Sequence, residues 1–272
     1  MSSILEQIIS SKRQEVAARK AAVPLAELQS RAAYAAPRLS LRAALINSPH
    51  FGIIAEFKRK SPSQADINTT ADVSQVVSGY AAAGAAALSV LTDQTYFGAL
   101  PTDFAQARAA VELPIIRKDF TIDVYQLHEA RALGADAVLL IAACLDAQSL
   151  DALARTAKDL GLEVLCEIHQ AEELKKISPA IDIVGVNNRD LRDFSLGIGR
   201  SFELGAQLEP GRLKISESGI EDAQSIVQLR RAGFQGFLIG THFMRQADPG
   251  AACADFIEQI ARIDQLYRGA IA

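Results

Sequence analysis

The chain contains the segment Leu133-Gly134-Ala135-Asp136-Ala137-Val138-Leu139-Leu140-Ile141, in which a helical pattern stops and a strand pattern starts. Gly134 suits the left-handed backbone position after a helix, where a Cβ atom would be strained. The apolar run that follows is typical of a buried strand. The same order of helix end, glycine and apolar run recurs at Ala83-Gly84 before Ala87–Leu91, at Leu160-Gly161 before Leu162–Cys166, and at Ala232-Gly233 before Gly236–Ile239.

These four places indicate a repeated unit. Their glycines are separated by near multiples of about 25 residues, a plausible length for one strand and one helix. Apolar residues at helical spacing, such as Val73, Val76, Val77 and Tyr80, occupy the intervals between strands. Four further apolar runs predict the remaining strands, at Ile53–Lys58, Pro114–Lys118, Ile181–Asn187 and Leu213–Glu217.

Alternation of strands and helices along the whole chain predicts parallel strands. Eight such strands close into a (β/α)8 TIM barrel, which we predict as the fold within the α/β class. An open doubly wound sheet is the alternative. Its dinucleotide-binding form would show G-x-G-x-x-G after the first strand, and that motif is missing there.

Residues 1–50 precede the first predicted strand. Ser3 and Glu6 have the spacing of a capping box, Pro24 suits the start of a second helix, and Ser40 suits the cap of a third. We predict an N-terminal helical extension that packs on the barrel, within one domain spanning residues 1–272. Two roles stay open for it, stabilisation of the barrel or a lid over one barrel mouth.

Composition excludes several classes of protein. The 272 residues carry a net charge of −4 without a basic stripe, so we expect no nucleic-acid partner. The three cysteines are widely separated and odd in number, which favours a reducing compartment. No signal peptide and no apolar run of about 18 residues is visible, so we expect a soluble cytoplasmic protein with no membrane contact. The four histidines show no metal-ligand spacing, and no metal is expected.

Polar residues follow most of the predicted strands. Glu56 and Lys58 lie two residues apart on one strand, so they face the same side. A salt bridge at the strand tip would explain this pair alone. In a barrel of this type, however, the C-terminal strand ends meet at one rim, where active sites form. The other polar ends include Lys118, Glu167, Asn187, Arg189, Glu217 and Ser218.

The last two strands are followed by glycines that suit a phosphate site. Ser218-Gly219-Ile220 and Gly240-Thr241-His242 each pass from a strand towards a helix. Glycine lets backbone N–H groups approach an anion, and a helix N-terminus adds its dipole. Tight turns would also explain these glycines.

Taken together, the motifs resemble those of the indole-3-glycerol-phosphate synthase family of tryptophan biosynthesis. The resemblance covers nearly the whole chain, with the motifs in the family's order. They are Ile54–Ser63, Ser89–Asp93 with Tyr96-Phe97, Arg117–Phe120, Glu167–His169, Asn187–Leu191 and Ser216–Ile220.

The resemblance implies a carboxy-lyase that uses neither cofactor nor metal. Its substrate would be 1-(2-carboxyphenylamino)-1-deoxyribulose 5-phosphate, which closes a ring and loses carbon dioxide and water to give indole-3-glycerol phosphate. Lys118 carries over as general acid, Lys58 holds the substrate carboxylate, and Glu56 orients Lys58. Glu167 would stabilise a cationic intermediate or remove a proton, and whether Glu56 or Glu167 is the base of the last step stays open.

Further positions carry over from the same family. Asn187, Glu217 and Ser218 match supporting positions of the catalytic group. Phe97 and Leu139 would wall the aromatic ring, although core packing explains them equally well. Two positions depart from the family, Gln64 in place of a usual lysine and His242 in place of a small hydroxyl residue. The residues expected to bind substrate or its phosphate are Ser61, Arg189, Gly219, Gly240 and Thr241.

Two other functions stay open. A phosphoribosylanthranilate isomerase-like enzyme would want a cysteine at the end of the first strand, where this chain has Glu56-Phe57-Lys58. A non-catalytic phosphate-binding barrel would not need both a lysine acid and several carboxylates. The expected partner is a phosphorylated small molecule, and other tryptophan-pathway enzymes are candidate protein partners.

Overall fold

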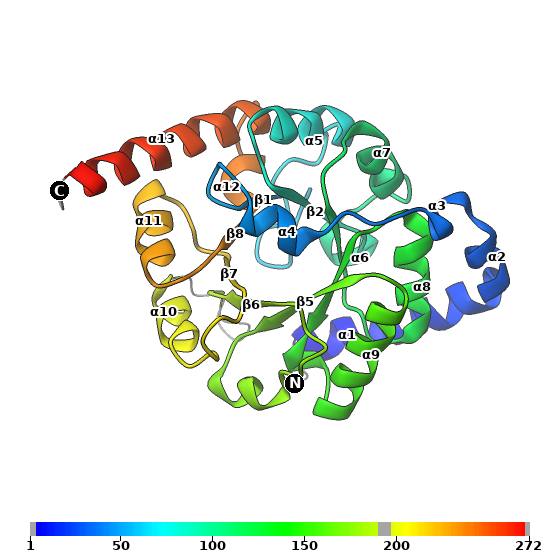
Figure 1. Ribbon diagram of the computed structural model, residues 1–272. Coiled ribbons are helices and arrows are strands. Elements are labelled where there is room, and N and C mark those ends of the chain that lie inside the picture. The colour runs from blue at the N-terminus through cyan, green and yellow to red at the C-terminus, as the bar shows by residue number, and fades with distance from the viewer. Residues whose placement is uncertain (1–3, 190–196, 270–272) are drawn as a thin grey trace.

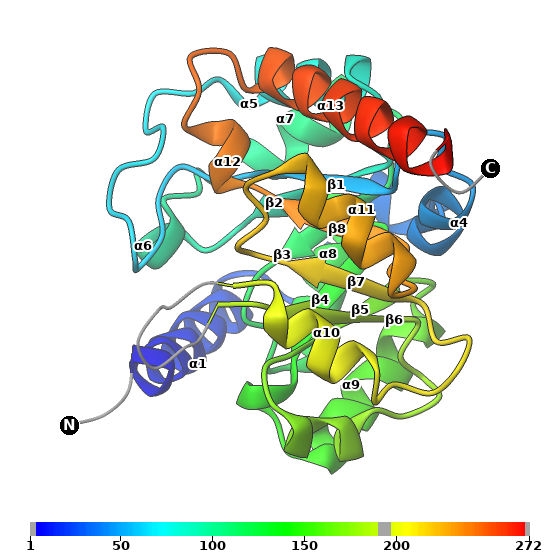
Figure 2. The same ribbon diagram turned by 90° about the vertical axis from the view of Figure 1, so that its left-hand side faces the viewer.

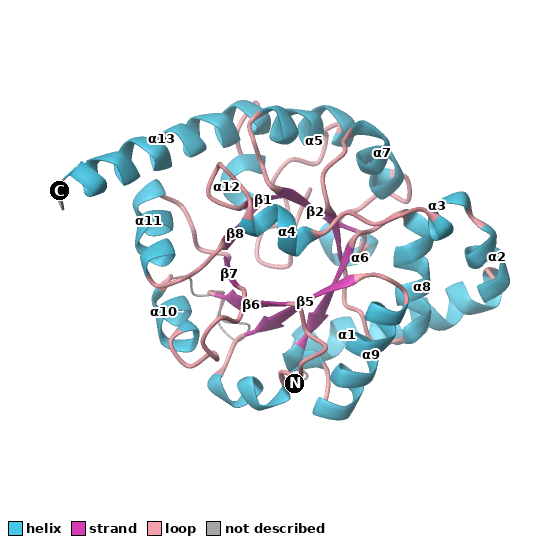
Figure 3. Ribbon diagram, in the orientation of Figure 1, coloured by secondary structure: helices cyan, strands magenta, loops and turns pink. Residues whose placement is uncertain are grey.

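The computed structural model describes residues 4–189 and 197–269. Eight parallel strands form a closed barrel in sequence order, in which β1 pairs with both β2 and β8. Figure 1 looks along this barrel, and Figure 3 shows the strands enclosed by helices. The predicted TIM barrel is confirmed. The strands are β1 (Ile53–Phe57), β2 (Ala87–Leu91), β3 (Ile115–Lys118), β4 (Ala137–Ile141), β5 (Glu163–Ile168), β6 (Ile183–Asn187), β7 (Lys214–Glu217) and β8 (Gly236–Ile239).

All eight predicted strands are present, with small shifts at their ends. β6 begins two residues later than predicted, and β5 runs on two residues further, to Ile168, because Glu167 and Ile168 pair with Gly185 and Val186 of β6. Glu167 therefore lies within a strand, not after it. The four glycines that defined the repeat all have positive φ, at 92° for Gly84, 88° for Gly134, 70° for Gly161 and 84° for Gly233.

Helices cover the outside of the barrel. The interval between β5 and β6 departs from the predicted alternation, because it holds only the 3-10 helix η2 (Ala171–Lys176). A second short 3-10 helix, η1 (Ala142–Cys144), follows β4. The α-helices after β1 are α5 (Val73–Ala82), α6 (Gln94–Phe97), α7 (Asp103–Ala110), α8 (Val124–Leu133), α9 (Ala147–Asp159), α10 (Gly199–Gly205), α11 (Ala223–Arg231), α12 (Thr241–Met244) and α13 (Pro249–Gly269).

The core has two layers. One fills the space between strands and outer helices, and includes Cys166, which faces the helices as a buried apolar residue. The other fills the barrel interior with residues such as Ile54, Leu139 and Leu165. Side chains therefore close the barrel, and a substrate can enter only at its mouth.

The N-terminal extension reaches both ends of the barrel. It comprises α1 (Ile4–Ala22), α2 (Leu25–Ser30), α3 (Ala32–Ala35) and α4 (Leu41–Ile46). Figure 2 shows α1 at the same end as α6, whereas α4 lies at the opposite end. Leu41 and Leu45 of α4 are buried in the barrel interior and close that opposite end.

The predicted helix starts of the extension are largely borne out. Pro24 precedes α2 directly, and the Ser40 side chain accepts a hydrogen bond from the Ala43 N–H as the cap of a helix. This helix is α4, the fourth and not the third, because the short helix α3, which was not predicted, precedes it. The predicted capping box depends on Ser3, which lies outside the described residues. Within residues 4–189 and 197–269, no helix combines the length and the apolar character needed to cross a membrane.

Candidate active site

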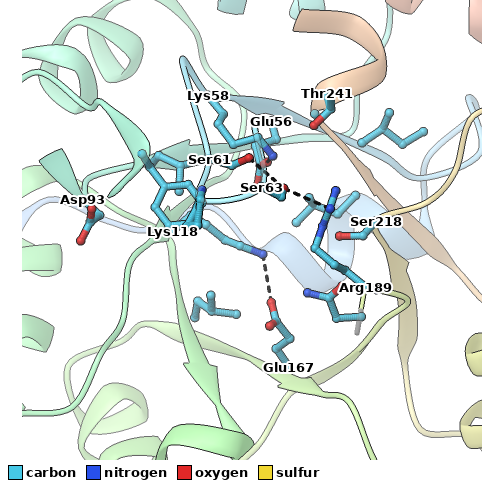
Figure 4. Close-up of a pocket in the computed structure, with 18 of the residues that line it drawn as sticks. Glu56, Lys58, Ser61, Ser63, Asp93, Lys118, Glu167, Arg189, Ser218 and Thr241 are labelled. Atoms are coloured by element: carbon cyan, nitrogen blue, oxygen red, sulfur yellow. Dashed lines mark hydrogen bonds and ion pairs between the residues drawn. The ribbon is translucent and has the colours of Figure 1, made fainter. Parts of the chain in front are cut away.

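A cavity of about 430 Å³ opens at the C-terminal ends of the strands. It is lined by residues of the strand ends, of the loops that follow them and of α1, and Figure 4 shows its polar part. Glu217 alone of the predicted site residues does not line it, although its side chain contacts one that does. The predicted residues that line the cavity are Glu56, Lys58, Ser61, Lys118, Glu167, Asn187, Arg189, Ser218, Gly219, Gly240 and Thr241.

Lys118 is the central cation of the cavity. Its Nζ lies 2.7 Å from Glu217 Oε2 and 3.2 Å from Glu167 Oε2, and its side chain is only 14% exposed. Burial lowers the pKa of Lys118, but Glu217, Glu167 and Glu56 outweigh burial, so its pKa is raised above the ordinary value. The sequence left this direction open. The structure indicates a lysine that stays protonated at neutral pH.

The two carboxylates beside Lys118 have opposite tendencies. Burial raises the pKa of both, but Lys118 and His169 outweigh it at Glu167, whose pKa is lowered. The pKa of Glu217 is raised, because burial and the negative charge of Glu167 exceed the effect of Lys118. Glu217 Oε1 has no hydrogen-bond partner among the described residues. Glu167 is thus the carboxylate that stays ionised, and Glu217 takes up a proton more readily.

Glu56 and Lys58 form the predicted pair at the end of β1. Lys58 Nζ donates to Glu56 Oε1 at 2.6 Å, and Ser89 Oγ donates to Glu56 Oε2 at 3.3 Å. Burial raises the pKa of Glu56, but Lys58 and Lys118 outweigh burial and lower it. The pair is a salt bridge and also part of the cavity wall, so both explanations offered by the sequence apply.

The glycine loops lie on another side of the cavity. Ser218 and Gly219 adopt successive left-handed conformations, with φ of 64° and 67°. Gly240 has a role that the sequence did not reveal, because a Cβ atom there would lie 2.6 Å from Glu56 Oε1. Gly240 therefore makes room for a carboxylate of the first strand as well as opening its own loop.

A further cation lines the cavity near the two residues that depart from the family pattern. Arg245 Nη2 donates to Gln64 Oε1 at 2.6 Å, and Arg245 and His242 both line the cavity. Arg189 Nη1 also reaches the first loop, 3.1 Å from Ser63 Oγ (Figure 4). Gln64 thus joins the first loop to the last one, a contact that no sequence pattern predicted.

An apolar wall completes the cavity. Phe97 and Leu139 line it as predicted, and the rings of Phe97 and Phe120 lie 6.1 Å apart, centroid to centroid. The sequence left open whether the N-terminal extension stabilises the barrel or covers a mouth, and it named no residue of α1 for this wall. Three residues of α1, namely Ile4, Leu5 and Ile8, line the same cavity. The extension therefore forms part of the cavity wall, whereas its role as a lid stays a prediction.

Across residues 4–189 and 197–269, no cluster of three His, Cys, Asp or Glu side chains is arranged to hold a metal ion. The cavity instead combines a buried ammonium group, carboxylates, an apolar wall and two glycine loops. A closed (β/α)8 barrel with such a mouth defines the class of barrel enzymes that act on small molecules.

Comparison with known proteins identifies the family within this class. The family model described as indole-3-glycerol phosphate synthase matches residues 5–256. The indole-3-glycerol phosphate synthase of Bacteroides thetaiotaomicron is 48% identical over 260 residues, which cover 96% of this chain and 100% of that protein. That of Verminephrobacter eiseniae is 43% identical over 263 residues, covering 93% of this chain and 98% of that protein. The chain belongs to the indole-3-glycerol phosphate synthase family.

Solved structures of more distant proteins share the fold. A tryptophan synthase complex from Pyrococcus furiosus contains a chain with a TM-score of 0.58 and 14% identity, covering 78% of this chain and 98% of that chain. A thiamine phosphate pyrophosphorylase from the same organism has a TM-score of 0.57 and 14% identity, covering 82% and 99%. At this identity the likeness concerns the barrel alone.

Proposed function

We propose that the protein catalyses the reaction of its family, conversion of 1-(2-carboxyphenylamino)-1-deoxyribulose 5-phosphate into indole-3-glycerol phosphate, carbon dioxide and water. The observation that carries the proposal is a cavity lined by Lys118 and Glu167, where Lys118 Nζ lies 3.2 Å from Glu167 and is held from behind by Glu217 at 2.7 Å. This substrate has an aromatic carboxylate, a ketone and a phosphate. The cavity offers a suitable surface for each of these parts.

The two ends of the substrate would fix its orientation. The aromatic ring fits the apolar wall of Phe97 and Leu139, and its carboxylate would pair with Lys58, which lines the cavity next to Glu56. The phosphate would lie against the loops of Gly219 and Gly240, with Thr241 beside them. Binding both ends holds the ring carbon close to the ketone, which lowers the entropic part of the barrier.

Ring closure needs an acid at the ketone oxygen. The ring carbon that bears the carboxylate forms a bond to the ketone carbon, and the ketone oxygen takes a proton to become a hydroxyl group. Lys118 is the donor in this proposal, since its raised pKa keeps it protonated when the substrate arrives. The positive charge left on the substrate would be stabilised by Glu167, whose lowered pKa keeps it ionised.

Carbon dioxide then leaves from the same ring carbon, and its bonding electrons restore the aromatic ring. In the last step the new hydroxyl group takes a proton from Lys58, which the loss of the carboxylate has freed, and leaves as water, while a base removes a proton from the neighbouring methylene carbon. We assign the base of this step to Glu167. Each candidate carboxylate is paired with a lysine, but Glu56 is held more closely by Lys58, at 2.6 Å, than Glu167 is by Lys118, at 3.2 Å, which makes Glu56 the weaker candidate.

The supporting residues act through these groups. Glu217 holds the Lys118 ammonium group, and Asn187, which lines the cavity with Glu167, helps to lower the pKa of that carboxyl group. Ser61, Arg189 and Ser218 line the cavity and are assigned to substrate contact. An isomerase function is not favoured, because the end of β1 carries Glu56 and Lys58 where such an enzyme would want a cysteine.

The test is a direct assay with this substrate. The chain has no tryptophan, so indole formation gives absorbance and fluorescence above a low protein background. We expect turnover by the folded protein that persists after exhaustive chelation. A folded protein without turnover would contradict the proposal. Turnover of N-(5-phosphoribosyl)anthranilate instead would favour the isomerase alternative.

A further inference from the structure

Lys12 of α1 is a buried charge that the mechanism does not use. Its side chain is 1% exposed, although lysine is almost never fully buried unless paired. Its Nζ lies 2.8 Å from Glu15 Oε2, 2.8 Å from Asp93 Oδ2 and 2.9 Å from Asp119 Oδ1. Two of these carboxylates belong to loops at the barrel mouth, so a single ammonium group joins the N-terminal helix to both loops.

Each of the two loop carboxylates also fixes the backbone next to an aromatic residue. Asp93 Oδ1 accepts a hydrogen bond from the Tyr96 N–H at 2.7 Å and caps α6, which ends at Phe97. Asp119 Oδ1 accepts one from the Phe120 N–H at 2.8 Å. Phe97 and Phe120 are the two aromatic residues of the apolar wall.

The helix that carries Lys12 supplies the rest of that wall. Ile8 lies one helical turn before Lys12 and lines the cavity, as do Ile4 and Leu5. Lys12 does not line the cavity itself. Its position therefore determines how three separate segments come together, without any contact between Lys12 and a bound molecule.

We propose that Lys12 is a positioning residue that assembles the subsite for the aromatic ring of the substrate. The inference rests on the proposed function, because that function supplies the ring. In this proposal Lys12 affects only the end of the cavity that binds the aromatic ring. Figure 4 shows Asp93 on one side of the cavity and Ser218 and Thr241 on the opposite side, where the phosphate is expected. Loss of the Lys12 ion pairs should therefore weaken binding of the ring and leave the phosphate loops unchanged.

The experiment compares two variants with a matched control on the same helix. Lys12→Met keeps the length and apolar character of the side chain but removes its charge. Asp93→Asn is milder, because asparagine still caps α6 while it loses the ion pair. The control is Lys20→Ala, which removes another α1 lysine, one that is half exposed, is paired with Asp123 at 2.7 Å and does not line the cavity. Circular dichroism and thermal unfolding establish that each variant is folded.

Three measurements are made on each protein: steady-state kinetics, the Kd of indole-3-glycerol phosphate, and the Kd of inorganic phosphate. For Lys12→Met we expect KM and the product Kd to rise about tenfold or more, while kcat changes by less than about threefold. The phosphate Kd should stay within about twofold, since no phosphate contact depends on this helix. Asp93→Asn should change the same quantities in the same direction by a smaller factor. Lys20→Ala should match the wild type.

The outcomes separate this inference from the proposed function. A wild-type protein that neither turns over the substrate nor binds the product overturns the proposed function. If the wild type does both, two results overturn the role of Lys12: unchanged product binding in both variants, or equal weakening of product and phosphate. Should Lys12→Met fail to fold, the product Kd and the phosphate Kd of Asp93→Asn alone decide whether Lys12 has the proposed role.

Discussion

Gly185 of β6 lies directly against the carboxylate of Glu217 on β7. A Cβ atom at position 185 would stand 1.9 Å from Glu217 Oε1, far closer than two such atoms can approach. Glu217 Oε2 in turn holds Lys118 Nζ at 2.7 Å. The lack of a side chain at position 185 is therefore what allows Glu217 to occupy the place from which it holds the proposed acid.

We predict that Gly185→Ala lowers kcat about tenfold to a hundredfold, because Glu217 must rotate and Lys118 then loses its shortest contact. Overpacking of this kind should also reduce the free energy of unfolding by about 1–3 kcal/mol. Steady-state kinetics and urea unfolding measure the two effects. The matched control is Gly199→Ala at the start of α10, where a Cβ atom would meet no atom within 4 Å. Equal kinetics for both variants would show that the position of Glu217 is unimportant.

Removal of the Lys118 ammonium group should nearly abolish catalysis while the barrel stays folded. Lys118→Ala is expected to lower kcat by about 10²-fold or more, the usual loss for a positioned acid. Single-turnover and steady-state assays report this, with Lys158→Ala as the control, a lysine on α9 paired with Asp182 at 3.3 Å. An unchanged kcat in Lys118→Ala would remove Lys118 from the mechanism.

The same variant should show a stronger dependence of stability on pH. Without Lys118, burial and the charge of Glu167, which His169 still helps to keep ionised, raise the folded-state pKa of Glu217 further above the unfolded value. A group whose pKa is raised in the folded state stabilises the fold at pH values below its unfolded-state pKa. This stabilisation is lost as the pH rises through its folded-state pKa. Urea unfolding at pH 5 and pH 8 should therefore show a larger deficit relative to the wild type at pH 8. A deficit that is larger at pH 5 would contradict this reasoning.

The sequence predicted the barrel because each strand is a short apolar run and each repeat glycine marks a helix end. Both signals are local. The capping of α4 by Ser40 and the pairing of Glu56 with Lys58 were predictable for the same reason. The 3-10 helix η2 was not predicted, because the alternation of strands and helices in the other repeats led us to expect an ordinary helix between β5 and β6.

Contacts between distant segments were not predictable in this way. An apolar stripe on α1 says that the helix packs somewhere, but not that Ile8 lines the cavity. Lys12 has no sequence signal of its own, since its three carboxylate partners are identified only by the fold. Gly185 gave no sequence signal, because a glycine that makes room for a side chain of the next strand resembles any other glycine.

Asp119 gives a prediction for acid unfolding. Burial raises its pKa, but Arg117, Lys12 and a hydrogen bond from Thr92 outweigh burial and lower it to about 2. A group whose pKa is lowered in the folded state stabilises the fold at pH values above its unfolded-state pKa. This stabilisation is lost as the pH falls through its folded-state pKa.

Asp119→Asn removes this contribution. The wild type should exceed the variant in unfolding free energy at pH 6, and that excess should shrink by about 2 kcal/mol as pH falls from about 5 to about 2. Urea unfolding of both proteins at several pH values measures the excess. A constant excess over this range would mean that the Asp119 carboxyl group is not held ionised by its neighbours.

The phosphate loops give the last prediction. Inorganic phosphate should compete with substrate, because the loops at Gly219 and Gly240 accept the anion in the proposed binding mode. Gly219 has φ of 67°, so Gly219→Val should distort its loop and raise the inhibition constant of phosphate about tenfold, the loss of about one hydrogen bond to a charged group. Gly240→Val should do the same, but it should also lower kcat, since its Cβ atom would press on Glu56 Oε1. Gly219→Val is therefore the cleaner test of the two. Phosphate inhibition that is unchanged in both variants would place the anion elsewhere in the cavity.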